Sequence, residues 1–118
     1  MMFPKPQRKK KRKKHKDSIL HCKDGTCYLC IKLRDDYRIY PVVHEHHVYD
    51  GPNRRISEAE GFKVYLCQSH HTDGKDAVHK NIDYMRMVQQ DCQKAFEENH
   101  TRQEFMELIG RNYLEDNG

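Results

Sequence analysis

Two metal-ligand pairs constrain the fold of this chain more than any other feature of its sequence. Cys27 and Cys30 form a Cys-x-x-Cys pair, Cys67 and His70 form a Cys-x-x-His pair, and 36 residues separate the two pairs. Pairs at such spacings are typical of proteins in which four side chains hold zinc in a tetrahedron. We therefore expect Cys27, Cys30, Cys67 and His70 to bind a structural zinc ion that joins two distant segments.

Charge divides the 118-residue chain into two parts. The first 16 residues hold nine Lys and Arg and no acid, whereas the remainder holds 13 cations against 18 acids, a net charge of −5. A block of like charges that contains Pro4 and Pro6 cannot bury apolar surface. We expect residues 1–17 to form a disordered Lys/Arg-rich arm on one globular domain, residues 18–118.

The arm is suited to contact nucleic-acid phosphates. Several clustered cations displace counterions from a phosphate backbone and give salt-dependent affinity that is indifferent to base sequence. A tail that aids solubility and a nuclear-import signal are the alternatives. The arm cations that we expect to contact nucleic acid are Lys9, Lys10, Lys11, Arg12, Lys13 and Lys14.

Composition also bears on the compartment. The sequence lacks a run of about 18 apolar residues that would predict a membrane span, and its N-terminus lacks the apolar segment of a secretory signal. Five cysteines without an export signal favour a reducing compartment in which thiols bind metal. We therefore expect a cytoplasmic protein. With no Trp and four Phe the core is thin, and zinc would add on the order of 10 kcal/mol to folding.

Periodicity and capping residues predict a mixed α+β domain. The β-branched and aromatic residues before Asp50-Gly51-Pro52 favour a strand, and the two strands could pair as a hairpin. We expect, in order, a strand at 38–49, a helix of barely two turns opened by the capping box Ser57–Glu60, a strand at 62–66, an amphipathic helix at 76–98 and a short helix opened by Thr101 and ended by Gly110.

Five of the 9 histidines fall in two tight groups, residues 44, 46, 47 and residues 70, 71. The alternation of a strand places His44 and His46 on one face and Glu45 and His47 on the other. Zinc takes four ligands, so His46, His47 and His71 remain and suggest a second, open metal site with a base beside it. We expect His44 to be a zinc ligand or a core residue, and Cys22 and Cys92 to be idle or buried thiols. We expect His79 to be an ordinary helix histidine, with a role as an extra metal ligand beyond His71 as the alternative.

The order of these motifs resembles that of the HNH endonucleases, whose ββα-metal site is often built on a treble-clef zinc scaffold. The motifs are, in order, Cys-x-x-Cys, Glu45-His46-His47, an Asn in a loop and Leu66-Cys-x-x-His-His. The closer resemblance is to small phage HNH proteins, including RecA-dependent recombination-enhancement nucleases, and it covers roughly residues 22–80. It implies a small zinc-held treble-clef ββα-metal domain with additional C-terminal helices.

The resemblance also implies roles for single residues. His46 and His71 would bind the catalytic metal, His47 would be the general base, and Asn53 would orient that base. Asn53 departs from the family pattern, because it lies six residues after His47 and well before Leu66. An exchange of roles between His71 and its neighbour His70 stays open.

These residue types suit phosphodiester hydrolysis. A neutral imidazole, with an ordinary pKa of about 6.5, can take a proton from water, and Mg²⁺ or another divalent metal can stabilise charge on the phosphate. We therefore expect a metal-dependent DNA endonuclease or nickase of phage type, with Arg54 and Arg55 on the DNA backbone. Candidate partners are a recombinase filament and phage recombination or packaging proteins in the bacterial host cytosol.

Two other functions compete with the nuclease. A non-catalytic zinc-knuckle module would use the same zinc site and arm to bind nucleic acid, and it has no use for an open second metal site. A Cys-x-x-Cys oxidoreductase is disfavoured because Cys27 and Cys30 lack the strand-to-helix context of a thioredoxin-like site.

Overall fold

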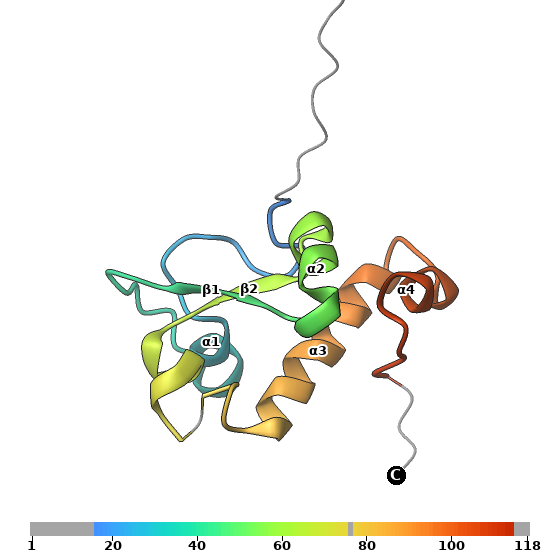
Figure 1. Cartoon of the computed structure of the whole chain (residues 1–118). Helices are drawn as coiled ribbons and strands as arrows, with labels where there is room; N and C mark the ends of the chain where they lie inside the picture. The colour runs from blue at the N-terminus through green and yellow to red at the C-terminus, as the bar shows by residue number, and fades with distance from the viewer. Residues whose placement is uncertain (1–15, 76, 115–118) are drawn as a thin grey trace, which may run out of the picture.

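A two-stranded antiparallel sheet lies at the centre of the structure, a computed structural model that describes residues 16–75 and 77–114. Strand β1 (His44–His47) pairs with β2 (Lys63–Leu66) in the register His44 to Leu66 and His47 to Lys63. The two predicted strands therefore do form a hairpin. Figure 1 shows helices α1 and α2 on opposite sides of this sheet.

Strand β1 is much shorter than the predicted span 38–49. Before it, the backbone N–H of Tyr40 donates to the carbonyl of Gly25 at 2.9 Å instead of to a strand. Ile39 and Val42 are 64% and 67% exposed, so the β-branched residues ahead of β1 have neither a partner strand nor a buried face. The prediction of a strand from residue 38 was wrong because it counted residue types without burial.

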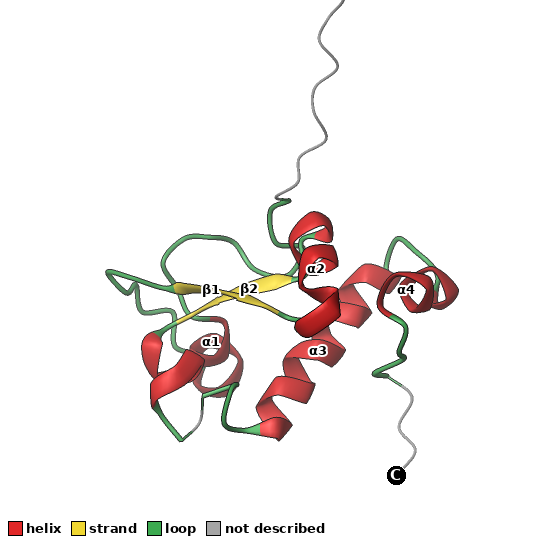
Figure 2. Ribbon diagram, in the orientation of Figure 1, coloured by secondary structure: helices red, strands yellow, loops and turns green. Residues whose placement is uncertain are grey.

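Four α-helices and two short turns complete the described fold (Figure 2). The α-helices are α1 (Tyr28–Arg34), α2 (Arg54–Glu60), α3 (Ile82–Glu97) and α4 (Arg102–Ile109). A 3-10 turn, η1 (Gly51–Asn53), leads directly into α2, and a π-helical turn, η2 (Ser69–Asp73), follows β2. Helix α1 was not predicted.

Helix α2 begins four residues earlier than the capping box predicts, because its N-cap is Asn53 instead of Ser57. Ser57 lies inside the helix and is fully buried. Its hydroxyl donates to the carbonyl of Tyr49 at 2.8 Å and accepts from the Tyr49 N–H at 3.2 Å. The prediction that Ser57 caps the helix was wrong, because its hydroxyl instead connects α2 to Tyr49, two residues after β1. Gly61, with a φ of 79°, ends the helix.

Helix α3 begins at Ile82, well after the predicted start at residue 76. The side chain of Asn81 accepts hydrogen bonds from the N–H groups of Asp83 and Tyr84 at 3.0 and 3.2 Å. This N-cap fixes the first turn of the helix. Ala77 and Val78 are buried in the preceding turn, so their apolar character misled the prediction. The capping box at Thr101 that opens α4 is confirmed.

Aromatic side chains from four segments form the core beyond the sheet. Tyr49 follows β1, Phe62 precedes β2, Phe96 belongs to α3 and Phe105 to α4. Their ring centroids lie between 5.5 and 6.0 Å apart in edge-to-face or tilted contacts. Cys92 is buried beside them, as predicted. This cluster joins the C-terminal helices to the hairpin.

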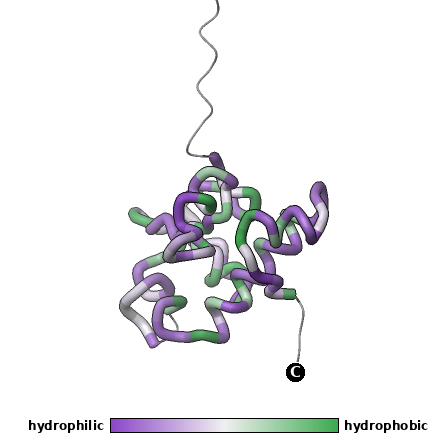
Figure 3. The backbone as a smooth tube through the Cα atoms, turned by 45° about the vertical axis from the view of Figure 1, so that its right-hand side comes forward, coloured by the Kyte–Doolittle hydropathy of each residue, from purple (hydrophilic) through white to green (hydrophobic). Residues whose placement is uncertain are grey.

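Hydrophilic and hydrophobic segments alternate along the backbone (Figure 3). Within residues 16–75 and 77–114, no helix is both long and apolar enough to cross a membrane. The arm cations singled out by the sequence, Lys9, Lys10, Lys11, Arg12, Lys13 and Lys14, lie outside the described residues.

Candidate metal centres

The four predicted zinc ligands form one buried cluster. The Nδ1 atom of His70 lies 3.4 Å from Cys27 Sγ, 3.5 Å from Cys30 Sγ and 3.4 Å from Cys67 Sγ, and the sulfurs of Cys30 and Cys67 are 4.0 Å apart. A tetrahedral zinc ion with ordinary bond lengths separates sulfur from nitrogen by about 3.6 Å and two sulfurs by about 3.8 Å. The cluster therefore has the donor atoms and the dimensions to bind zinc.

Local backbone geometry delivers these ligands. Cys27 is the N-cap of α1 and Cys30 lies in its first turn, so both sulfurs face the same side of the helix start. After β2, the N–H groups of His70 and His71 both donate to the carbonyl of Cys67, at 3.1 and 2.9 Å. This tight turn folds the His70 ring back over the Cys67 sulfur. The structure thus places His70, and not His71, with the cysteines.

Burial determines the protonation of the cluster thiols in the absence of a metal. Burial raises the pKa of the Cys27 thiol to about 12 and also raises the pKa of Cys30. A bound zinc ion would hold these cysteines as thiolates, because a coordinating thiol is deprotonated. The hydroxyl of Tyr40 lies 3.0 Å from Cys30 Sγ, where it can donate a hydrogen bond to the thiolate.

A second cluster consists of three histidines, His46, His71 and His79, which we call the histidine tripod. Their ligand nitrogens lie within 4.8 Å of one another, and their ring centroids are 4.8 to 5.5 Å apart. His46 comes from β1, His71 from η2 and His79 from the turn before α3. Two of the three residues were expected at a metal site. Three imidazoles can hold a divalent metal and leave positions open for water or substrate.

The expectation that His79 lies in a helix was wrong. The N–H groups of Lys80 and Asn81 both donate to the carbonyl of Ala77 at 2.9 Å, so His79 lies in a turn. The sequence signal that could have placed it is Asn81, a preferred N-cap residue. A helix that starts after Asn81 leaves His79 in the preceding loop, where it can reach β1.

Two of the tripod histidines, His46 and His71, favour the neutral form. Burial, together with the neighbouring imidazoles of His79 and His71, lowers the pKa of His46 to about 3. Burial also lowers the pKa of His71, as do His79 and His44, against a smaller opposing effect of Asp50. Neutral imidazoles keep the lone pairs that bind a metal.

His44 lies beside the tripod and not in the zinc cluster. Its Nδ1 atom is 3.0 Å from Nδ1 of His71, while Nε2 of His71 is 3.2 Å from Nε2 of His79. His71 therefore directs one ring nitrogen to His44 and the other into the tripod. Donation from the Nδ1–H of His71 to His44 would leave the Nε2 lone pair free for a metal.

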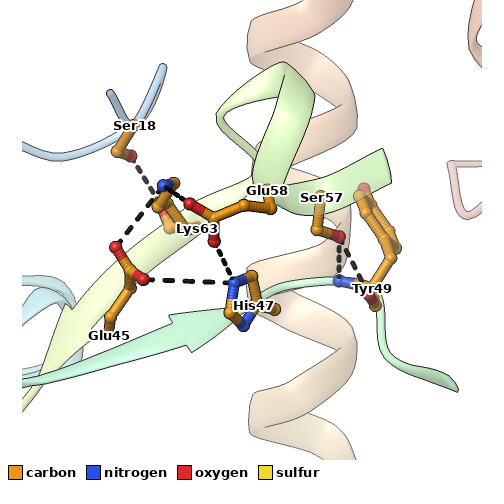
Figure 4. Close-up of polar contacts among 7 residues, drawn as sticks. All are labelled: Ser18, Glu45, His47, Tyr49, Ser57, Glu58 and Lys63. Atoms are coloured by element: carbon orange, nitrogen blue, oxygen red, sulfur yellow. Dashed lines mark hydrogen bonds and ion pairs between the residues drawn. The ribbon is translucent and has the colours of Figure 1, made fainter. Parts of the chain in front are cut away.

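His47 lies on the opposite face of β1, as strand alternation predicts. Its Nε2 atom makes a hydrogen bond to the carboxylate of Glu58 and lies 4.0 Å from the carboxylate of Glu45 (Figure 4). The ammonium of Lys63 lies 2.9 Å from Glu58 and 3.4 Å from Glu45. These four side chains, His47, Glu45, Glu58 and Lys63, form what we call the His47 network. His47 is thus separated from His46 and His71 by the strand itself.

The remaining predicted residues lie around the start of α2. The side-chain N–H of Asn53 donates to the carbonyl of Ile109 at the end of α4, at 3.0 Å. Its role in orienting the base stays a prediction. Arg54 and Arg55 are exposed in the first turn of α2, and Cys22 is an exposed thiol.

Comparison of the chain with known protein families, with curated proteins and with solved structures finds no match.

Proposed function

We propose that this protein is a metal-dependent DNA endonuclease or nickase whose catalytic metal is held by the histidine tripod. The tripod is the observation that carries the proposal, because three imidazoles from distant segments meet in addition to the complete Cys-His cluster. A structural zinc site has no need of a second set of ligands. The treble-clef ββα-metal architecture is part of the same proposal, as are the phage setting and the bacterial cytoplasm.

The tripod would hold a divalent transition metal, because imidazole ligands suit such a metal better than Mg²⁺; this metal would stabilise charge on the phosphate and on the leaving oxygen. His47 takes the proton of the attacking water. The water oxygen bonds to phosphorus, the bond from phosphorus to the 3′ oxygen breaks, and solvent protonates that oxygen. By resemblance to the HNH family, the products carry a 5′-phosphate and a 3′-hydroxyl.

The placement of His46 and His47 on opposite faces of β1 fits this chemistry. In phosphoryl transfer the attacking and leaving oxygens lie roughly in line on opposite sides of phosphorus. Among the described residues, β1 pairs with β2 on one edge and with no strand on the other. A phosphodiester along that outer edge would have the tripod on one side and the base on the other.

The basic arm is the proposed source of DNA affinity. The backbone N–H of Lys16 donates to the carbonyl of Glu58 at 3.1 Å, so the chain reaches the basic segment from beside α2 and the His47 network. Exposed Arg54 and Arg55 lie in the same helix. Phosphate contacts of this kind position a duplex without reading its sequence. A recombinase filament or phage recombination and packaging proteins are the proposed partners.

Cleavage of supercoiled plasmid tests the proposal. Relaxed or linear product should appear with Mg²⁺ or Mn²⁺ and not with EDTA. His71→Ala and His79→Ala should abolish cleavage while keeping one zinc per chain, and His47→Ala should slow it on the order of 100-fold. His100→Ala, which removes a histidine at the end of α3, is the matched control and should cut normally. Full activity of His71→Ala or His79→Ala would contradict the proposal.

A non-catalytic nucleic-acid-binding module is the second candidate. The observation in its favour is that the cluster of Cys27, Cys30, Cys67 and His70 is complete and buried without the tripod. This function predicts salt-dependent DNA binding with no cleavage in any metal, and binding that is unchanged in His79→Ala.

A further inference from the structure

Asn53, which was expected to orient the His47 base, makes a different contact. The amide of Asn53 donates to the carbonyl of Ile109 at 3.0 Å and so connects the start of α2 to the end of α4. The hydrogen bond of the His47 ring goes instead to Glu58, which lies one helical turn further along α2. An ionised carboxylate is a stronger acceptor for an imidazole N–H than an amide.

We propose that Glu58 is the positioning residue of the His47 base and that Lys63 holds Glu58 in place. This inference rests on the proposed function. A neutral imidazole has one donor and one acceptor nitrogen, and an ionised carboxylate can only accept. The proton of His47 is therefore on Nε2, towards Glu58, and the lone pair is on Nδ1. Figure 4 shows the second ring nitrogen pointing away from both carboxylates, so Nδ1 is the atom that takes the proton from water.

The carboxylate of Glu58 is held from two directions. One oxygen bonds to Nε2 of His47 and the other accepts from the ammonium of Lys63 at 2.9 Å. Lys63 is only 3% exposed, and a buried ammonium requires a partner of opposite charge. Burial alone would lower the pKa of Lys63, but the hydrogen bond to Glu58 and the charge of Glu45 outweigh it and raise the pKa. Lys63 therefore stays charged and fixes the carboxylate.

The net charge of the His47 network also favours His47 as a base. Two carboxylates and one ammonium leave one negative charge while His47 is neutral. Protonation of His47 at Nδ1 brings the network to neutrality, so the imidazolium that forms during reaction is stabilised where it arises. The same ammonium argues against a metal at Glu45, His47 and Glu58, because Lys63 already contacts both carboxylates.

Steady-state cleavage by the full chain tests the assignment. Glu58→Gln keeps the shape of the side chain but removes its charge, and it should lower kcat on the order of 100-fold with little change in KM. Zinc content and Mn²⁺ affinity should match wild type. Glu60→Gln, the same substitution two residues along α2, is the control and should leave kcat unchanged. A normal kcat in Glu58→Gln overturns the inference and leaves the proposed function intact.

A second variant tests whether a loss of kcat in Glu58→Gln is caused by misfolding. Loss of the Glu58 charge leaves the Lys63 ammonium with Glu45 as its remaining carboxylate in the His47 network, and Glu58→Gln/Lys63→Met removes the Glu58 and Lys63 charges together. The double variant should fold by circular dichroism and show the same loss of kcat. Recovery of wild-type kcat in the folded double variant would overturn the inference, because His47 would then need no carboxylate.

The His47 tautomer gives a readout that does not depend on cleavage. Nitrogen-15 spectra of the zinc-loaded wild-type protein, without a further metal added for the tripod, should show the His47 proton on Nε2 and an unprotonated Nδ1. A proton on Nδ1 overturns the inference even if the protein cuts DNA. Wild-type protein that cuts no DNA in any metal is a different failure, because it refutes the proposed function and removes the reaction in which His47 would act.

Discussion

Neighbouring histidines in this protein belong to different sites because adjacent residues point in different directions. His46 faces the tripod and His47 faces Glu58, since successive side chains of a strand leave opposite faces. His70 and His71 diverge in the same way from one π-helical turn. A one-residue change of register in β1 would exchange the two environments.

The contact between His44 and His71 supports a prediction about metal affinity. His44→Phe removes the acceptor that orients the His71 ring, so Mn²⁺ affinity at the tripod should fall by about 10-fold or more. Isothermal titration calorimetry on zinc-loaded protein measures this affinity. His44→Gln, whose side-chain carbonyl can still accept, should lose less. Equal affinities for wild type and His44→Phe would show that His71 needs no such partner.

At the scale of elements, helix boundaries decide which residues can reach the sites. The periodicity of Val88, Cys92 and Phe96 correctly predicted that α3 is amphipathic, because all three are buried. Periodicity did not locate the start of the helix, since Ala77 and Val78 fit the same apolar pattern and are buried in a turn. The cap at Asn81, and not the apolar pattern, places His79 in the tripod.

Removal of that cap should therefore affect both stability and metal binding. Asn81→Ala leaves the N–H groups of Asp83 and Tyr84 without their acceptor, and it should lower the free energy of unfolding by about 1 kcal/mol. Urea unfolding of the zinc-loaded protein measures this loss. Mn²⁺ affinity should fall as well, because His79 lies two residues before the cap. Asn81→Asp, which keeps a capping oxygen, should retain most of both properties.

At the scale of the whole molecule, the Cys-His cluster and the aromatic cluster stabilise different parts. The Cys-His cluster joins the start of α1 to the turn after β2, whereas Tyr49, Phe62, Phe96 and Phe105 join the hairpin to α3 and α4. Helix α1 has seven residues, too few for an isolated helix to be stable in water. We therefore expect the segment around Cys27 to depend on metal for its structure.

Cysteine substitutions should distinguish the thiols of the Cys-His cluster from the other thiols by their effect on stability. Cys67→Ser removes a buried ligand and should cost much of the zinc contribution, which is on the order of 10 kcal/mol, so the protein should lose its cooperative thermal transition. Cys22→Ser makes the same change at an exposed thiol and should unfold like wild type. Circular dichroism with zinc analysis measures both. A cooperative, zinc-free Cys67→Ser protein would refute the structural role of the metal.

The sequence by itself determined the four members of the Cys-His cluster and the two faces of β1, because ligand spacing and strand alternation are local properties of the chain. Tertiary structure decided that His79 meets His46 in the tripod, 33 positions further along the chain, and that Glu58 of α2, in the connection between the two strands, meets His47. Local patterns show which residues favour a helix, a strand or burial. A cap such as Asn81 marks where a helix begins. Which side chains finally meet depends also on which face of the sheet each helix covers, and long-range packing sets that face.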